Sequence, residues 1–340
     1  MKLIDPVNDF QIPREWLDRV DMPSRELAEG VRAGLLVVLS NGKVLHRGFT
    51  TGTTAAAAAK ASVLSLREKV DSVSVPTPAG IRAHLSTQAA GGRAEVVKIP
   101  GDHESDATGG LVFIAKAIPS SRIELLAGPG IGRVTRGGLQ VEVGMPAINP
   151  APYRQILESI REALDETGLE GAIVSLSVPD GETVGAQTLN PQVGVEGGIS
   201  ILGTTGFVEP WSDHLGETRM DLIRDAPSVV LTTGRIGMRY SQMLFPEHTV
   251  VMVGSRLDEG IKASGGETIL CGLPGLILKW AVPDILEGTG FNTVLEMVDN
   301  DPANPNLDRA LEAAVNKAGR TRIILLDRDG TIIKDTESIA

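Results

Sequence analysis

The sequence predicts a mixed α+β and α/β protein of two domains. An antiparallel α+β domain is expected over residues 1–205, and a Rossmann-like parallel α/β domain over residues 206–340. The length of 340 residues exceeds the roughly 250–300 residues at which a single core stops growing. Middle segments alternate apolar and polar residues, which is typical of strands with one face in water. The last third carries short continuous apolar runs, which indicate strands buried on both faces of a parallel sheet.

The composition excludes several classes of protein. The net charge of -11 and the aromatic content of 3% argue against a nucleic-acid partner, which needs cationic surface and stacking side chains. The only cysteine, Cys271, cannot form an internal disulfide, which favours a cytoplasmic location. Apolar runs such as Leu35–Leu39 are far shorter than the about 20 residues that span a bilayer. We therefore expect neither a membrane segment nor a signal peptide.

The first domain is expected to begin with few regular elements. Leu35–Leu39 predicts a strand, and Asn41-Gly42 behind it predicts a turn. Residues 73–75 and 81–85 alternate at period two, and residues 134–143 do so less regularly. Each of these segments predicts a strand of an antiparallel sheet.

Two helices are expected beside these strands. The first runs from Thr54 through Val70, because apolar residues recur there at helical spacing. The second follows Asn149, a favourable N-cap, and has Pro150 at its first helical position. Its buried stripe consists of Ile156, Ile160 and Ala163.

The second domain is expected to contain a parallel sheet with crossover helices. Helix-like segments separate its short apolar runs, which are residues 229–231, 250–253, 269–271 and 323–326. In such sheets, ligands bind beyond the carboxyl ends of the strands. Gly, Thr, Ser and Arg follow several predicted strands, at residues 203–206, 232–235 and 254–256. A single turn of this kind needs no ligand to explain it, but several such turns at strand ends together favour a ligand crevice.

The segment from Gly48 to Lys60 is the most informative motif. Four threonines at a helix start offer hydroxyls, free backbone N–H groups and the positive end of the helix dipole, which suit a carboxylate or phosphate. The run Ala55–Ala59 leaves the helix surface bare, so another backbone or a large flat ligand can approach closely. The alternative is a capped, closely packed helix, and the spacing alone leaves both open.

An acidic loop over residues 101–108 places three carboxylates and a histidine within five positions. These groups suit acid–base chemistry or a hard cation, and a solvated loop is the alternative.

Three other signals are rejected. Residues 128–132 imitate a dinucleotide fingerprint, but Arg133 stands where its third glycine belongs. Residues 327–331 imitate a phosphatase nucleophile motif but have too few residues after them. Cys271 is expected in the core.

Four segments together resemble a known family, and they stand in the family's order. These are Gly48 to Lys60, Asn149-Pro150, residues 177–182, and Gly197 to Pro210. They resemble the cobalt-precorrin-5B C1-methyltransferases of the anaerobic cobalamin pathway. The resemblance runs from about Phe10 to Trp280. It is strongest to the archaeal branch, owing to residues 101–104, residues 232–235 and Pro274-Gly275.

The resemblance implies a methyl transfer from S-adenosylmethionine to carbon 1 of cobalt-precorrin-5B. The products would be cobalt-precorrin-6A and S-adenosylhomocysteine. The partner would be a polycarboxylate corrinoid precursor whose cobalt belongs to the substrate, so we predict no protein-bound metal. A homo-oligomer is left open. Because the nucleophile is a carbon of the macrocycle, no protein nucleophile is needed, and alignment is what the protein supplies.

Residue roles follow from this implied reaction. Arg133, Arg136 and Arg235 would meet substrate carboxylates, Glu209 would contact the ribose or amino group of the donor, and Asp102 or His103 would accept a proton. The full predicted binding set is Thr50, Thr51, Gly52, Thr53, Thr54, Arg133, Arg136, Asn149, Gly203, Thr204, Thr205, Gly206, Glu209, Thr232, Thr233, Gly234 and Arg235.

The sequence also departs from the family pattern. Bacterial members carry Cys where Thr54 stands, and their acidic motif is one residue shorter and lacks His103. A Gly-His-x-Gly-Lys run of many members is replaced by residues 272–276, so neither that His nor that Lys is essential here. Two other function classes stay open on the residues alone: a nucleotide-dependent oxidoreductase and a non-catalytic carrier of the corrinoid intermediate.

Overall fold

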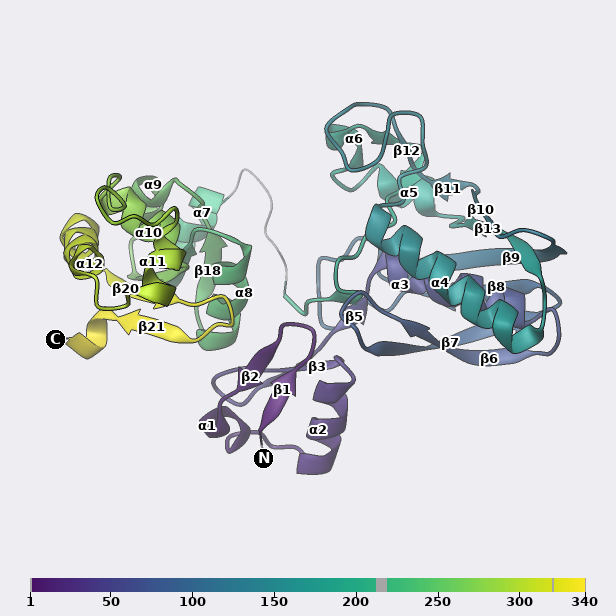
Figure 1. The fold of residues 1–340 in the computed structure, drawn as a ribbon, viewed down its shortest axis with the longest axis horizontal. Coiled ribbons are helices and arrows are strands. Elements are labelled where there is room, and N and C mark those ends of the chain that lie inside the picture. The colour runs from purple at the N-terminus through teal and green to yellow at the C-terminus, as the bar shows by residue number, and fades with distance from the viewer. Residues whose placement is uncertain (1, 212–218, 320, 340) are drawn as a thin grey trace.

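The computed structural model describes residues 2–211, 219–319 and 321–339. It has a mixed α/β architecture with two larger sheets and a short N-terminal part. Figure 1 shows the N-terminal part at the bottom, a sheet packed with α3 and α4 on the right, and a sheet surrounded by helices on the left. Within the described ranges, no helix is both long and apolar enough to span a membrane.

The N-terminal part consists of two small antiparallel hairpins and two helices. Its elements are β1 (Leu3–Asp5), β2 (Phe10–Ile12), α1 (Arg14–Leu17), α2 (Ser24–Arg32), β3 (Leu36–Val38) and β4 (Val44–His46). The predicted strand at Leu35–Leu39 is thus confirmed as β3. The apolar residues of this part share one core with the C-terminal sheet, and the Phe10 and Tyr240 rings lie 5.4 Å apart. The division of the chain near residue 205 stays a prediction.

The middle of the chain forms a six-stranded sheet with the order β10-β13-β9-β8-β7-β6. All neighbouring strands are antiparallel except β10 and β13. The strands are β6 (Val70–Pro76), β7 (Arg82–Ala90), β8 (Arg93–Val97), β9 (Val112–Ser120), β10 (Glu124–Ala127) and β13 (Gly171–Ser177). The antiparallel strands predicted at residues 73–75 and 81–85 are therefore confirmed.

Two helices pack on this sheet, α3 (Thr51–Leu64) and α4 (Pro150–Thr167). The predicted second helix and its buried stripe are confirmed. The predicted first helix is wrong at its C-terminal end, because it stops at Leu64 and Val70 already begins β6. Its residues up to Val63 are all buried, so α3 is a core helix rather than an amphipathic one. A short strand pair also forms beside α3, between β5 (Gly48–Phe49) and β16 (Phe207–Val208).

A small lobe extends from one end of this sheet (Figure 1). It contains β11 (Gly130–Ile131), β12 (Arg133–Val134), α5 (Gly181–Gly185), α6 (Asn190–Val193), β14 (Val195–Glu196) and β15 (Gly198–Ile199). The strand predicted over residues 134–143 is wrong beyond Val134, because turns and bends follow it. The lobe has its own minor core of Val134, Ala147 and Val195.

The C-terminal sheet has the order β18-β17-β19-β20-β21. Its first four strands pair in parallel and β21 is antiparallel. The strands are β17 (Ser228–Thr232), β18 (Thr249–Met252), β19 (Glu267–Gly272), β20 (Arg322–Leu326) and β21 (Ile332–Asp335). This confirms all four predicted apolar runs as strands of a parallel sheet. The chain ends in the 3₁₀ turn η1 (Thr336–Ile339).

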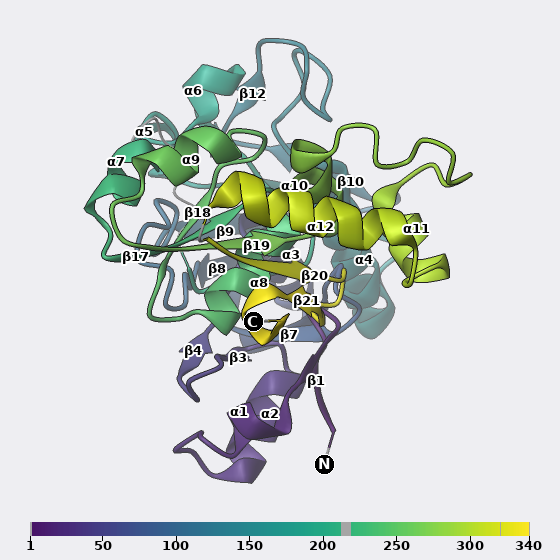
Figure 2. The ribbon, with the colours of Figure 1, turned by 90° about the vertical axis from the view of Figure 1, so that its left-hand side faces the viewer.

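Helices cover both faces of this sheet, as Figure 2 shows from the side. Strand residues of one face share a core with α8 (Arg235–Leu244) and the N-terminal part. The opposite face packs against α7 (Arg219–Asp225), α9 (Leu257–Ala263), α10 (Pro274–Ala281), α11 (Val294–Asn300) and α12 (Pro305–Ala318).

Two rejected motifs are structural, as expected. Residues 327–331 form the turn between β20 and β21, where the Asp327 N–H donates to the Thr331 carbonyl at 2.8 Å. Cys271 lies on β19 with no exposed surface, and burial raises the pKa of its thiol to about 12. A thiol with that pKa stays protonated at neutral pH and is a poor nucleophile.

Candidate ligand-binding site

The C-terminal sheet contains a topological switch point between β17 and β19. The chain leaves β17 into α8, which lies on one face, and leaves β19 into α10, which lies on the other. The two connections therefore diverge at the carboxyl ends of two neighbouring strands. In open α/β sheets this divergence creates the crevice in which ligands bind.

A cavity of about 440 Å³ lies at this position, and we call it the switch-point pocket. It is lined by the loop after β17, by the loop after β19 and by the start of α11. Its lining residues are Thr233, Gly234, Arg235, Ile236, Gly237, Leu273, Gly275, Leu276, Lys279, Thr293, Val294 and Leu295. Most of the wall is apolar, and the few polar groups are two cations and two threonines. That mixture is typical of a small-molecule site.

The polar groups of the switch-point pocket have few partners within the protein. Arg235 and Lys279 have no hydrogen bond or ion pair to any described residue, and no carboxylate is among the lining residues. Thr233 is only 7% exposed, yet its hydroxyl has no hydrogen-bond partner in the described part of the chain. The Thr232 hydroxyl behind it is fully buried and also unpartnered. These groups leave the pocket cationic with unused hydrogen-bonding capacity.

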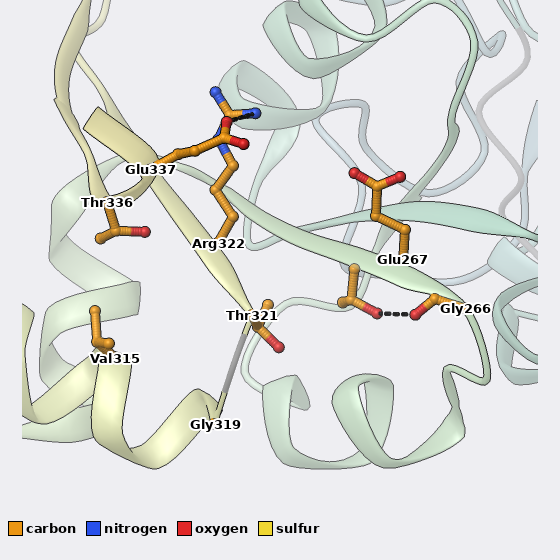
Figure 3. Close-up of a pocket in the computed structure, with 9 residues that line it drawn as sticks. Gly266, Glu267, Val315, Gly319, Thr321, Arg322, Thr336 and Glu337 are labelled. Atoms are coloured by element: carbon orange, nitrogen blue, oxygen red, sulfur yellow. Dashed lines mark hydrogen bonds and ion pairs between the residues drawn. The ribbon is translucent and has the colours of Figure 1, made fainter. Parts of the chain in front are cut away.

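A larger cavity of about 660 Å³ lies at the opposite end of the strands, and Figure 3 shows it. It adjoins the first residues of β19 and β20 rather than their carboxyl ends. Its cation, Arg322, is already paired with Asp335 at 2.7 Å and Glu337 at 2.6 Å. The charge of this cation is thus already neutralised within the protein, unlike the charges of Arg235 and Lys279 in the switch-point pocket.

The threonine-rich helix start at α3 is folded against protein rather than open to a ligand. The expectation of free N–H groups there is wrong, because Gly52 N–H donates to the Leu202 carbonyl at 2.9 Å and Thr53 N–H to the Thr50 hydroxyl at 3.2 Å. The Thr53 hydroxyl donates to the Gly206 carbonyl at 2.8 Å, and the Thr54 hydroxyl to the Thr50 carbonyl at 2.9 Å. The Thr51 hydroxyl donates to the Ser200 carbonyl at 3.1 Å.

The glycine and threonine turn at residues 203–206 is the protein partner of that helix start. A Cβ on Gly203 would lie 2.4 Å from the Thr50 hydroxyl oxygen, so only glycine allows this approach. The Thr205 carbonyl accepts the Ala79 N–H, whereas Thr204 is exposed. Ala55–Ala59 have no exposed surface, so the bare helix side admits protein and not a flat ligand. The closely packed interpretation of this motif is therefore the correct one.

Glu209 belongs to a buried ionic network that the sequence did not reveal. Arg47 is fully buried at its side chain and pairs with Asp5 at 2.6 Å and with Glu209 at 3.0 Å. Arg239 of α8 lies 3.9 Å from Glu209. Burial alone would lower the pKa of Arg47, but the charges of Glu209 and Asp5 outweigh it and raise that pKa. The network connects the N-terminal part, the segment after β16 and α8.

The acidic loop is mostly solvated. The Asp102 carboxylate accepts the backbone N–H of His46 at 2.8 Å and lies 3.4 Å from the His46 ring nitrogen Nδ1. Asp106 pairs with the buried Lys98 and accepts the Thr108 hydroxyl at 2.6 Å. His103 has a buried Nδ1 without a partner. Over the described ranges, no three His, Cys, Asp or Glu side chains gather as metal ligands would.

The remaining predicted residues lie on or beside the small lobe. The exposed Arg133 donates to the Gly144 carbonyl at 2.8 Å, and the exposed Arg136 to the Pro191 carbonyl at 2.5 Å. Asn149 is the N-cap of α4 by position, but its side chain makes no capping hydrogen bond. Of the predicted set, only Thr233, Gly234 and Arg235 line the switch-point pocket, and no sequence motif pointed to Lys279 or Thr293.

Comparison with known proteins gives consistent matches along the whole chain. The family model CbiD matches residues 38–210. A protein of Methanococcoides burtonii named cobalt-precorrin-5B C(1)-methyltransferase is 56% identical over 99% of both chains. A protein of Methanosarcina acetivorans with the same name is 57% identical over 99% of both chains.

A solved structure is also similar. The crystal structure of cobalamin biosynthesis protein CbiD from Archaeoglobus fulgidus is 37% identical to this chain. The match covers 95% of this chain and 100% of the other, with a TM-score of 0.58. The similarity therefore extends beyond residue 210, where the family model ends, and includes the C-terminal sheet.

Proposed function

The chain belongs to the CbiD family, and from this premise we propose that it transfers a methyl group from S-adenosylmethionine to carbon 1 of cobalt-precorrin-5B. The observation that carries the proposal is the 56% identity over nearly the full length to a relative named for this reaction. Identity this high over both sheets preserves the whole fold and not one isolated motif. The predicted resemblance is confirmed by the same matches.

The reaction requires alignment more than covalent chemistry from the protein. The donor supplies an electrophilic methyl group on a sulfonium, and the electron-rich macrocycle supplies the carbon nucleophile. The protein must hold both in line and exclude competing water. Such positioning accounts for roughly 7–11 kcal/mol of a barrier.

We place the methyl donor in the switch-point pocket. Three features support this placement: the position between β17 and β19, the apolar wall of Ile236, Leu273 and Leu276, and the unpartnered Thr233 hydroxyl. The volume of about 440 Å³ suits a ligand of nucleoside size. Gly203, which belongs to the predicted binding set, is not part of this proposed site, because it packs directly on Thr50.

We place the corrinoid precursor with Arg133 and Arg136 of the small lobe. Each guanidinium donates one hydrogen bond to a backbone carbonyl and is otherwise exposed, so its remaining N–H donors are available to substrate carboxylates. Asp102 stays the proposed acid–base residue. His46 joins it, because a carboxylate beside an imidazole can orient that ring for proton transfer.

Three further proposals accompany this function. We propose the cytoplasm as the location of the protein and a homo-oligomer as a candidate for its assembly state. The two-domain arrangement with a Rossmann-like second half also stays a proposal, supported by the parallel pairing of β17 to β20.

Mass spectrometry of the corrinoid after incubation with isotopically labelled donor tests the function directly. The expected result is a product heavier by one labelled methyl group, together with S-adenosylhomocysteine. Binding of the corrinoid without any mass change would favour the carrier alternative. Quenching of nicotinamide fluorescence on titration, without methyl transfer, would favour the oxidoreductase alternative.

A further inference from the structure

We propose that Arg235 and Lys279 form a carboxylate-binding site in the switch-point pocket. The inference rests on the proposed function and specifies the chemical group that this pocket recognises. The carboxylate has two sources in the reaction, the methionine part of the methyl donor and a side chain of the corrinoid precursor. Both present the same carboxylate at the end of an alkyl chain of a larger organic molecule.

The first argument is the charge within the pocket. Two cations line one cavity of about 440 Å³, although the whole chain has 43 acidic and only 32 basic residues. At the next strand-end turn, by contrast, Arg256 is neutralised by Glu259 at 2.6 Å. Arg235 and Lys279 have no such partner in the described part of the chain. Like charges in one cavity repel each other, and a bound anion removes that repulsion.

The second argument is the supply of hydrogen-bond donors. α8 has 10 residues and α10 has 8, and both begin at the pocket without a side-chain cap. The first N–H groups of a helix have no partner within that helix and favour an anion. Thr233 is only 7% exposed, and its hydroxyl, which has no partner in the described part of the chain, lines the same cavity as an independent donor. A carboxylate accepts several such bonds at once.

The third argument is the apolar remainder of the wall. Ile236, Leu276 and Val294 offer no group that would hold a hydrated inorganic ion. The cavity therefore suits an anion attached to an apolar body better than a free phosphate or sulfate. No carboxylate lines it, so a purely cationic ligand gains nothing there.

Calorimetry with S-adenosylhomocysteine and with 5′-methylthioadenosine, which lacks the amino-acid carboxylate, tests the proposal without turnover. Arg235→Gln and Lys279→Gln are the test variants. Arg309→Gln and Lys262→Gln are the matched controls, because both residues are exposed on helices that pack against the same sheet, α12 and α9. If the donor supplies the carboxylate, each test variant weakens S-adenosylhomocysteine binding by about ten- to a hundredfold. Methylthioadenosine binding stays unchanged, and Arg235→Lys restores part of the loss.

Steady-state kinetics on the full chain distinguishes the other source. If the corrinoid supplies the carboxylate, the test variants raise the KM for corrinoid about tenfold or more and leave S-adenosylhomocysteine affinity unchanged. The inference is overturned if wild type methylates corrinoid while both test variants match the controls in affinity and in both KM values. A wild-type protein that neither binds S-adenosylhomocysteine nor methylates corrinoid would overturn the proposed function, and the inference with it.

Discussion

Glu162 is a carboxylate with a strongly depressed pKa. It accepts hydrogen bonds from the Arg82 guanidinium at 2.8 Å and from the buried Lys60 ammonium at 2.7 Å. These contacts, led by the hydrogen bond from Arg82, lower its pKa from 4.5 to about 2. Lys60 lies on the core helix α3, so the pair anchors α4 to α3.

The depressed pKa of Glu162 predicts a loss of stability in acid. Its contribution to the free energy of unfolding is fully present above pH 4.5 and is lost as the pH falls through about 2. Thermal unfolding between pH 6 and pH 2 measures this loss. Glu162→Gln should be less stable by about 1–2 kcal/mol at neutral pH and should show a flatter acid profile. A mutant profile parallel to that of wild type would contradict the role of this residue.

The close packing of Gly203 predicts that its substitution lowers stability rather than catalytic activity. It has a φ of +144°, and an added Cβ would meet the Thr50 hydroxyl oxygen at 2.4 Å. Gly203→Ala should therefore lower the free energy of unfolding by about 1–3 kcal/mol, measured by urea denaturation. Gly197→Ala is the matched control, because Gly197 also has a positive φ but no atom within 4 Å of the added Cβ. Equal losses in both variants would show that backbone strain alone matters.

Several elements could be read from the sequence because local pattern determines them. The four apolar runs of the C-terminal sheet became parallel strands, since strands buried on both faces need continuous apolar residues. The sequence predicts α3 to extend to Val70, because Leu66 and Val70 continue its apolar spacing. The helix ends at Leu64 instead, since the chain turns at residues 65–69. The apolar residues keep their helical spacing through this turn, so the spacing cannot reveal a turn that tertiary packing causes.

The network of Arg47 predicts strong coupling between elements. Arg47→Met would leave Asp5, which is 1% exposed, as a buried carboxylate without its cation. Loss of one partner of a buried pair costs about 3–5 kcal/mol, so the free energy of unfolding should fall by that amount. Glu209→Gln keeps Arg47 paired with Asp5 and should cost clearly less. Urea unfolding of both variants measures the difference, and equal costs would contradict the assignment of Asp5 as the main partner.

At the scale of the whole molecule, the sequence did not reveal which parts lie together. The first forty residues fall within the antiparallel domain predicted over residues 1–205, yet their apolar residues share a core with α8 and the C-terminal sheet. Of the two unpaired cations of the switch-point pocket, only Arg235 could be predicted, because it follows a strand. Lys279 lies within α10, and the position of that helix depends on the crossover connection. Contacts between residues more than 200 positions apart leave no periodic signal in one sequence.

The shared core predicts that removal of residues 1–46 damages the C-terminal sheet and not only the N-terminal part. Such a truncation uncovers Tyr240 and Met243, which are 1% exposed in the intact chain. We expect binding of a hydrophobic dye, a lowered melting temperature and loss of the affinity for S-adenosylhomocysteine. A truncated protein that keeps wild-type melting and affinity would show that α8 holds its place without the N-terminal part.

The packing of Phe10 against Tyr240 also has a consequence for biosynthesis. A ribosome adds roughly 5–20 residues per second, so the beginning of the nascent polypeptide waits about 10–45 seconds before its partner emerges. Trp16, Leu27 and Val31 stay without their final neighbours during that interval. Chaperones that bind apolar segments have this window in which to act, and slowing translation lengthens it.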